Sequence, residues 1–467
     1  LGLQTGDHMA FCLENRIEFL PLAWGAHYAG LYYTAISSRL TADEIAYIVD
    51  DCGARVFVPS PYKADAVEAV TAATPKVETR FSLGGPLPGH ACFEDAVAAQ
   101  SADPDPDAVE GQDMLYSSGT TGRPKGVKSP LPNAALGRAS SITMMARFLF
   151  SAEEGVVYLS PAPLYHAAPL RFCLGYQRLG CTVVVMERFD AEDALAAIEA
   201  HGVHTSQWVP TMFVRLLKLP PEARERYDVS SLEFVVHAAA PCPPDVKRQM
   251  IEWWGPVINE YYGATETGGV VFHTAEEALR KPGTVGRPIE GGTVRIYDEE
   301  GEELGPNETG EVYLRIEGMP DFTYNGLDAK RREIERDGLI TAGDIGFVDE
   351  DGYLFLCDRK NDMVISGGVN IYPAEIEAAI ISMAEVHDCA VFGIPNEEFG
   401  EELCAFIEPE AGHDLTVPMV RTYLADRLAR YKIPRVIEFR RSLPREDSGK
   451  IFKRKLRAPF WEDAGRQ

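Results

Sequence analysis

The sequence Met114-Leu-Tyr-Ser-Ser-Gly-Thr-Thr-Gly-Arg-Pro-Lys-Gly-Val-Lys128 decides how the rest of the chain is interpreted. It begins with an apolar pair typical of the end of a buried strand, and continues through hydroxyl residues and glycines to a lysine. Glycines let backbone N–H groups approach an anion, hydroxyls add donors and a lysine adds positive charge. The pattern therefore predicts a strand followed by a loop that binds a polyphosphate. The loop residues are Ser117, Ser118, Gly119, Thr120, Thr121, Gly122 and Lys125.

Two other interpretations of this loop are weaker. A Walker A loop requires a second glycine five residues after Gly119, and that position is Pro124. A flexible Ser/Gly linker does not account for Pro124-Lys125-Gly126 behind two threonines. The loop closely resembles the signature loop of the adenylate-forming superfamily, which includes acyl- and aryl-CoA ligases, peptide-synthetase adenylation domains and firefly-type luciferases. The resemblance implies that the loop holds the β- and γ-phosphates of ATP and that Lys125 takes part in catalysis.

Length and composition favour a large globular enzyme. With 467 residues the chain is too long for one ordinary core, so we expect two or more domains. The net charge of −26 repels nucleic-acid phosphates and anionic lipid headgroups, which argues against a nucleic-acid partner. No apolar run is long enough to span a bilayer and no signal peptide is visible, so we expect a cytoplasmic protein without a transmembrane segment.

The cysteines and the first residues add two expectations. The nine cysteines form no Cys-x-x-Cys pair and mostly occur in apolar runs, so we expect buried thiols in a reducing compartment. The chain begins with Leu1 instead of methionine, and residues 1–7 look like the interior of a family member. We therefore expect that an N-terminal segment is missing from this sequence.

Strand-like and helix-like stretches alternate along the first half of the chain. This alternation predicts doubly wound α/β sheets, whose ligands gather at the carboxyl ends of strands. Thr41 and Glu44 predict a capping box, and the β-branched run 181–186 predicts a buried strand. Residues 292–316 have an antiparallel β pattern, and the resemblance implies a β-barrel-like part there. We expect strands at 55–58, 156–159, 181–186, 205–209 and 234–237, and helices at 18–29, 41–50 and 211–217.

The sequence Asn259-Glu-Tyr-Tyr-Gly-Ala-Thr-Glu-Thr267 is the second strong signature. A tyrosine can stack on adenine, Thr265 can donate to the α-phosphate, and Glu266 can hold Mg²⁺. A helix cap would also explain Thr265-Glu266, but the match to the family pattern Tyr-Gly-x-Thr-Glu favours a nucleotide site. The resemblance further implies that Asp344 binds the ribose. Beyond the loop, the residues that the resemblance implies for ATP and AMP binding are Ala239, Ala240, Pro241, Glu260, Tyr261, Tyr262, Gly263, Thr265, Asp344, Arg359 and Lys450.

A pocket for the acid is predicted beside this set. His166 follows a strand end, where a histidine can be a packed residue, a general base or a pocket wall, and the resemblance favours the wall. Small residues at 238–240 leave room for a flat ligand. The candidate walls are Tyr165, His166, Trp208, His237, Ala238, Gly263 and Gly268.

The charged run 358–362 marks an expected boundary between a large N-terminal domain, residues 1–358, and a small mobile α/β domain, residues 359–467. A solvated turn is the ordinary explanation of such a run. The resemblance implies a hinge at Asn361, a coenzyme A tunnel at Gly367 and Gly368, and a catalytic lysine at Lys450 that bridges carboxylate and α-phosphate during adenylation.

Together these signatures predict an AMP-forming acyl-CoA ligase. A carboxylate is a poor acyl donor, and a mixed anhydride with AMP has a far better leaving group. The resemblance implies ATP, Mg²⁺ and coenzyme A as cofactors, a hydrophobic carboxylic acid as substrate and a possible homodimer. The alternatives are an enzyme that loads a carrier protein, a luciferase-like oxidase and a relative limited to one half-reaction. Residues 163–180 contain no acidic residue to pair with an amino acid's ammonium, which favours a plain acid and coenzyme A.

Overall fold

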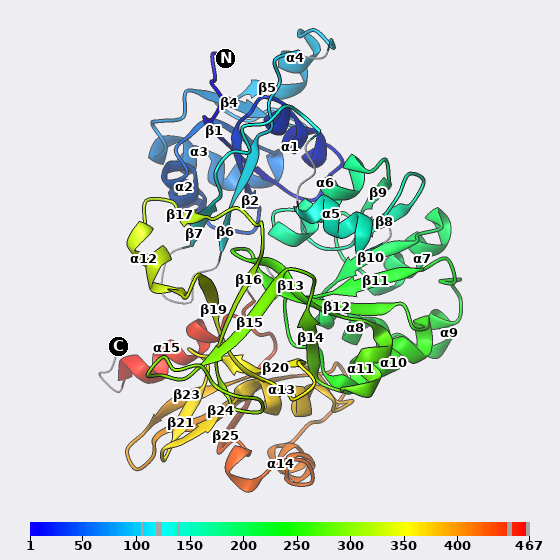
Figure 1. The fold of residues 1–467 in the computed structure, drawn as a ribbon, viewed down its shortest axis with the longest axis vertical. Helices are drawn as coiled ribbons and strands as arrows, with labels where there is room; N and C mark the ends of the chain where they lie inside the picture. The colour runs from blue at the N-terminus through cyan, green and yellow to red at the C-terminus, as the bar shows by residue number, and fades with distance from the viewer. Residues whose placement is uncertain (104–105, 118–123, 138–140, 151, 446–450, 464–467) are drawn as a thin grey trace.

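The computed structural model describes residues 1–103, 106–117, 124–137, 141–150, 152–445 and 451–463, and these residues form three β-sheets (Figure 1). The first sheet has the strand order β17-β7-β6-β2-β1-β3-β4-β5, with parallel pairing from β6 to β5. Its strands are β1 (His8–Leu13), β2 (Tyr32–Ser37), β3 (Ala54–Pro59), β4 (Thr79–Ser82), β5 (Ala91–Cys92), β6 (Gln112–Ser117), β7 (Lys125–Lys128) and β17 (Thr323–Tyr324).

The second sheet continues from parallel into antiparallel strands. Its order is β15-β16-β19-β20-β14-β13-β12-β11-β10-β8-β9, with β18 paired to β19. The parallel strands are β8 (Val157–Ser160), β9 (Thr182–Val185), β10 (Thr205–Trp208), β11 (Phe234–His237) and β12 (Ile258–Ala264). The antiparallel strands are β13 (Gly268–His273), β14 (Thr284–Pro288), β15 (Gly292–Tyr297), β16 (Gly310–Ile316), β18 (Glu335–Arg336), β19 (Leu339–Val348) and β20 (Leu354–Arg359).

Helices cover both faces of these two sheets. One apolar core combines residues of α1, α6 and the facing sides of the first and second sheets. The outer face of the first sheet packs against α2 and α3, and the outer face of the second packs against α7, α8 and α10. The helices are α1 (Phe19–Tyr28), α2 (Ala42–Asp51), α3 (Ala64–Ala73), α4 (Phe93–Ala98), α5 (Ser141–Phe148), α6 (Ala167–Arg178), α7 (Ala191–His201), α8 (Pro210–Leu217), α9 (Pro221–Arg224), α10 (Pro244–Trp254), α11 (Ala275–Arg280) and α12 (Asp328–Glu333).

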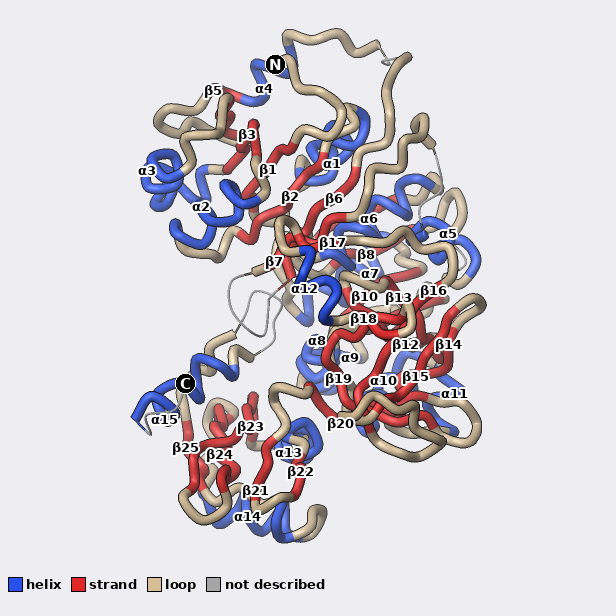
Figure 2. The backbone as a smooth tube through the Cα atoms, turned by 60° about the vertical axis from the view of Figure 1, so that its left-hand side comes forward, coloured by secondary structure: helices blue, strands red, loops and turns tan. Residues whose placement is uncertain are grey.

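The third sheet belongs to the last hundred residues, which lie below the other two sheets in Figure 2. Its order is β22-β21-β24-β23, with β25 parallel to β24. Its core is formed with α13 and α14, and α15 packs on the other face. The elements are β21 (Val364–Ser366), β22 (Val369–Ile371), α13 (Pro373–Ile381), β23 (Val386–Asn396), β24 (Gly400–Pro409), α14 (Val417–Ala425), β25 (Val436–Phe439) and α15 (Lys453–Asp463).

The α/β architecture predicted from the sequence is confirmed, with local differences. The Thr41–Glu44 capping box is present at the start of α2. The strand expected to be buried at 181–186 is β9, but it is the edge of the second sheet and is only half-buried, because a β-branched run does not reveal whether a strand has neighbours on both sides. Six of the nine cysteines are buried as expected, whereas Cys92 is exposed. No helix in the described part of the chain is long and apolar enough to cross a membrane.

Asn15 connects the first and second sheets. It follows β1 and is 8% exposed. Its amide nitrogen donates to the carbonyls of Ala162 and Met186 at 3.0 and 2.9 Å, and its amide oxygen accepts from the Leu164 N–H at 2.8 Å. One side chain therefore satisfies three buried backbone groups of the loops after β8 and β9.

Replacing Asn15 with alanine should lower the free energy of unfolding by about 2 to 4 kcal/mol, because the three backbone groups lose their partner in a buried place. Denaturant unfolding of Asn15→Ala measures this loss. Gln100→Ala is the matched control, since that amide is exposed and donates to the carbonyl of Ala96 in the preceding helix α4. Equal stabilities of the two variants would contradict the role of Asn15.

Candidate active site

A cleft of about 3010 Å³ lies between the two large sheets and the C-terminal sheet. The carboxyl ends of β6, β8, β11 and β12 open onto it, as expected for doubly wound sheets. Most of the predicted site residues line this cleft. They are Ser117, Lys125, Tyr165, His166, Ala238, Ala239, Ala240, Pro241, Glu260, Tyr261, Tyr262, Gly263, Thr265, Glu266, Gly268, Asp344, Arg359 and Asn361.

The two ends of the predicted phosphate loop face the cleft. Ser117 ends β6 and is paired with Lys125, the first residue of β7, so the hairpin holds both ends of the loop together. The central loop residues Ser118, Gly119, Thr120, Thr121 and Gly122 lie outside the described residues. Burial lowers the pKa of Lys125, and the nearby Lys330 adds to this effect. Lys125 lines the cleft at the start of β7.

Tyr324 connects Lys125 with Glu266. The Lys125 Nζ lies 4.9 Å from the centre of the Tyr324 ring, and the Tyr324 hydroxyl donates to Glu266 Oε1 at 3.1 Å. Tyr324 is in β17, which pairs with β7 and so reaches this place from a distant part of the sequence. The arrangement holds a cation and a carboxylate on either side of one tyrosine in the cleft.

Asp344 lines the cleft and is held from two sides. The Tyr262 hydroxyl donates to Asp344 Oδ2 at 2.6 Å, and Arg359 Nε lies 2.7 Å from Asp344 Oδ1. Asp344 and Arg359 are opposite each other in β19 and β20, so the sheet register fixes their ion pair. Burial alone would lower the pKa of Arg359, but Asp344 raises it above its usual value. The three predicted nucleotide residues thus form one fixed group.

The turn 238–241 lines the cleft as a wall of small residues. Ala239 has a φ of 76°, an uncommon left-handed conformation for a residue with a Cβ. At Gly263 a Cβ atom would come within 1.7 Å of the Gly268 carbonyl oxygen, so this close approach of β12 and β13 requires glycine. The cleft is therefore bordered here by small residues from the turn and from both strands.

Two predicted acid-pocket residues do not line the cleft. Trp208 is fully buried among residues of α8 and α10, and its indole N–H donates to Ser206 Oγ at 2.6 Å. His237 is also fully buried. The prediction that their side chains form pocket walls is wrong, because alternate residues of a strand face opposite sides and these two face the outer core. Tyr165 and His166 do line the cleft, with ring centres 4.4 Å apart.

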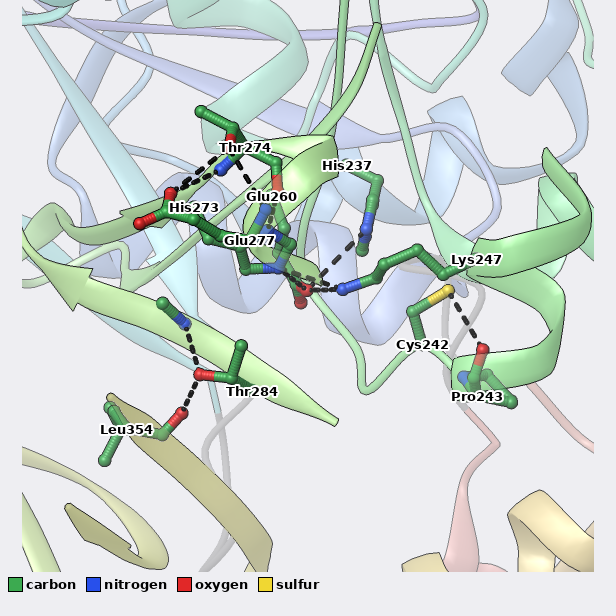
Figure 3. Close-up of polar contacts among 11 residues, drawn as sticks. His237, Cys242, Pro243, Lys247, Glu260, His273, Thr274, Glu277, Thr284 and Leu354 are labelled. Carbon is green, nitrogen blue, oxygen red and sulfur yellow. Dashed lines mark hydrogen bonds and ion pairs between the residues drawn. The ribbon is translucent and has the colours of Figure 1, made fainter. Parts of the chain in front are cut away.

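The carboxylate of Glu260 is used in a buried cluster behind the wall (Figure 3). Lys247 pairs with Glu260, and His273 Nε2 lies 2.9 Å from Glu260 Oε2. Burial alone would raise the pKa of Glu260, but Lys247 and the neighbouring histidines hold it well below its usual range. The assignment of this side chain to nucleotide binding is therefore corrected: the Lys247–Glu260–His273 cluster anchors β12 to α10 and leaves Tyr261 and Tyr262 at the cleft.

Of the predicted site residues beyond Arg359 that the structure describes, only Asn361 lines the cleft. Asn361 lines the cleft, and its carbonyl accepts from Arg457 Nη1 of α15 at 3.0 Å. Gly367 and Gly368 form the tip of the β21–β22 hairpin, with positive φ values of 58° and 79°, and they do not line the cleft. Lys450 lies outside the described residues, although Arg445 and Ile451 on either side of that segment line the cleft.

Two polar or charged side chains of the site, Tyr324 and Arg171, were not predicted from the sequence. Tyr324 carried no recognisable motif, since its role depends on the pairing of β17 with β7. Arg171 in α6 pairs with Asp113 at 2.8 Å and donates to the Thr265 carbonyl at 3.4 Å. An arginine inside the otherwise apolar run 167–176 was the available signal.

Comparison with known proteins agrees with this geometry. The model of the family described as AMP-binding enzyme matches residues 1–319, and that of the AMP-binding enzyme C-terminal domain matches residues 375–450. The chain belongs to the AMP-binding enzyme family. It is 31% identical to "Long-chain-fatty-acid--CoA ligase FadD13" of Mycobacterium tuberculosis, over 98% of this chain and 89% of the relative. It is 32% identical to "Feruloyl-CoA synthase" of Amycolatopsis sp, over 98% of this chain and 90% of that protein.

Solved structures of this family have the same fold. The crystal structure of ATP-bound MatB from Rhodopseudomonas palustris superposes with a TM-score of 0.84 at 28% identity, covering 99% of this chain and 90% of MatB. The large N-terminal part and small C-terminal part expected from the sequence are thus those of adenylate-forming enzymes.

Stability should decrease as the pH falls from 6.5 to 4.5. Burial lowers the pKa of His237 to about 3. Between pH 6.5 and 4.5 this imidazole is therefore protonated in the unfolded chain and neutral in the folded one. One such proton corresponds to about 1.4 kcal/mol per pH unit. Replacing His237 with leucine should reduce the loss of unfolding free energy by up to this amount per pH unit. Part of the loss should remain, because burial also lowers the pKa values of His8 and His27.

Denaturant unfolding at several pH values in this window measures the slope. The same substitution at the exposed His413 is the matched control. An unchanged slope in His237→Leu would show that the buried histidine is protonated in the folded protein.

Proposed function

We propose that this chain is an AMP-forming acyl-CoA ligase for a hydrophobic carboxylic acid. The observation that supports this most is the Asp344 group, in which Tyr262 and Arg359 fix a carboxylate suited to the two ribose hydroxyls, in the same cleft as Lys125 and Glu266. Family membership and the CoA-ligase names of its relatives agree with this activity.

In the first half-reaction a carboxylate oxygen of the acid attacks the α-phosphorus of ATP. A P–O bond forms, the bond to pyrophosphate breaks, and an acyl-adenylate results. Acid and triphosphate are both anionic, so the protein must supply positive charge where they meet. Lys125 and the loop N–H groups would face the leaving pyrophosphate, the Thr265 hydroxyl would donate to the α-phosphate, and Lys450 would lie at the reacting centre.

The residues present fit a Mg²⁺ ion that is bound together with ATP. No group of three or more potential metal ligands occurs among the described residues, so a cage made wholly of protein is absent from that part of the chain. Glu266 offers a carboxylate beside Lys125, held in place by Tyr324. Mg²⁺ usually takes one or two carboxylates and substrate phosphates, and it would neutralise phosphate charge here.

In the second half-reaction the thiol of coenzyme A attacks the acyl carbon and AMP leaves. The thiol must approach the carbonyl that Lys450 serves in the first step, so the two steps need different arrangements of the C-terminal part. We propose that residues 359–467 rotate about Asn361, which brings Gly367 and Gly368 to the cleft. In the present arrangement the tip of the β21–β22 hairpin is outside the cleft, as the adenylation step would require.

The acid would bind between α6 and the carboxyl ends of β10 to β12. Ala168, Phe172 and Tyr261 line the cleft there, and the rings of Phe172 and Tyr261 stack with their centres 5.9 Å apart. Such a surface suits fatty, aromatic and alicyclic acids. The names of FadD13 and the feruloyl-CoA synthase describe a fatty and a phenolic acid substrate for those two relatives.

Release of pyrophosphate from ATP, measured in the presence of Mg²⁺, tests the proposal directly. The assay uses a panel of fatty, benzoic, cinnamic and polycyclic acids, with and without coenzyme A. Release that depends on one class of acid, together with a CoA thioester, supports the ligase. Acid-dependent release without thioester would favour a carrier-protein acceptor or a single half-reaction, and no release with any acid would overturn the proposal.

Replacing Lys450 with alanine should reduce adenylate formation by at least about 100-fold, because the reacting centre loses its cation. Thioester formation from a supplied acyl-adenylate should be largely retained. Arg454→Ala, at an exposed cation four residues along the chain that does not line the cleft, is the matched control. Equal loss of both half-reactions in Lys450→Ala would contradict the proposed rotation about Asn361.

Replacing Gly367 with leucine should have the opposite effect. Acid-dependent pyrophosphate release in a single turnover should persist, whereas transfer to coenzyme A should fall by at least about tenfold, because a side chain blocks a narrow passage. Gly412→Leu controls for backbone strain, since Gly412 also has a positive φ, 82°, and has open space around it. Normal thioester formation in Gly367→Leu would remove this residue from the coenzyme A path.

A further inference from the structure

Gln207 lines the cleft next to the proposed acid pocket, although it is only 2% exposed. Alternate residues of β10 face opposite sides of the sheet. Ser206 and Trp208 are hydrogen-bonded to each other on the outer side. Thr205 faces the other side, where its hydroxyl lies 3.0 Å from the Tyr176 hydroxyl of α6. Gln207 is two residues further along β10, so its side chain faces α6 as well.

The position of Gln207 along the pocket follows from helix and strand geometry. Two residues of a strand advance about 6.6 Å, and four residues of a helix advance about 6 Å. Because Thr205 is level with Tyr176 and α6 runs antiparallel to the strand, Gln207 is level with Phe172, one helical turn nearer the cleft. Its neighbour in β11 is Val236, which belongs to the same apolar core as Phe172. Gln207 is thus a polar residue set among apolar ones.

One end of the Gln207 amide has no partner among the residues that the structure describes. Nε2 donates to the Trp208 carbonyl at 3.2 Å, which fixes the orientation of the amide, since a flip would place two oxygens against each other. Oε1 is buried and accepts no hydrogen bond from any described residue. Leaving a buried acceptor unsatisfied is unfavourable, and a methionine or leucine would fill the same place without that cost. A molecule bound in the cleft can supply the missing donor.

We propose that Gln207 Oε1 accepts a hydrogen bond from the acid substrate, so that the preferred acid carries a hydroxyl or amine N–H on its otherwise apolar body. This inference rests on the proposed function, because it requires the acid to bind between α6 and β10. An ether or methyl group at the same point has no hydrogen to donate and leaves Oε1 unsatisfied. Gln207 then determines which hydrophobic acids are used. The residues proposed to bind ATP do not take part in this selection.

The test compares kcat/KM for pyrophosphate release between matched acids. Each parent acid is paired with its hydroxy analogues, one for each ring position of benzoic and cinnamic acid and for several chain positions of a fatty acid, and with methoxy analogues as controls for size. We expect one hydroxy acid to exceed both its parent and its methoxy analogue by about tenfold in the native protein. Gln207→Met, which keeps the length but removes the acceptor, should reduce that ratio to about one.

Ser206→Ala is the matched control, because it removes a hydrogen bond from the same strand on the side away from the cleft. It should leave the ratio between the paired acids unchanged even if it lowers stability. Ratios near one for every pair in the native protein would overturn the inference while acid turnover still supports the ligase. Equal losses on both acids in Gln207→Met would also overturn it, and turnover of no acid at all would overturn the ligase itself.

Discussion

The ion pair between Asp344 and Arg359 is the contact on which the site depends. It joins β19 to β20 across the sheet, and it fixes the carboxylate that Tyr262 approaches from β12. Three strands from different parts of the sequence are thereby held at one point of the cleft. Arg359 is also two residues before Asn361, so the strand that completes the proposed ribose site leads directly into the C-terminal part. Nucleotide binding and movement of that part would share one short segment of backbone.

The buried Lys247–Glu260–His273 cluster supports the same point from behind. An ion pair away from water is costly unless its partners are complete, and here a lysine and a histidine both contact the carboxylate. The cluster ties β12 to α10, so Tyr261 and Tyr262 project from a strand that is anchored one residue earlier. Tyr261 and Tyr262 are therefore positioned by charged side chains that are buried behind the strand.

Much of this arrangement follows from sequence patterns that act locally. The capping box of α2, the alternation of strands and helices, and the strand ends near residues 117, 166 and 238 depend on neighbouring residues, and a single sequence reveals them. The side of a strand is harder to assign. Trp208 and His237 looked like pocket residues, yet the pocket side of β10 belongs to Gln207. Tyr324 could not be found at all, because a two-residue strand gives no periodic signal and its partner β7 is distant in the sequence.

The pairing of β17 with β7 also has a consequence for synthesis of the protein on the ribosome. The free edge of β7 is covered only when Thr323 and Tyr324 arrive, roughly 200 residues after Lys128. At ordinary translation speeds of about 5 to 20 residues per second, this edge is exposed for roughly 10 to 40 s. An uncovered strand edge is a site for pairing with other chains. During this period the edge of β7 is open to pairing with other chains. A chaperone that binds the nascent chain would cover this edge until β17 is synthesised.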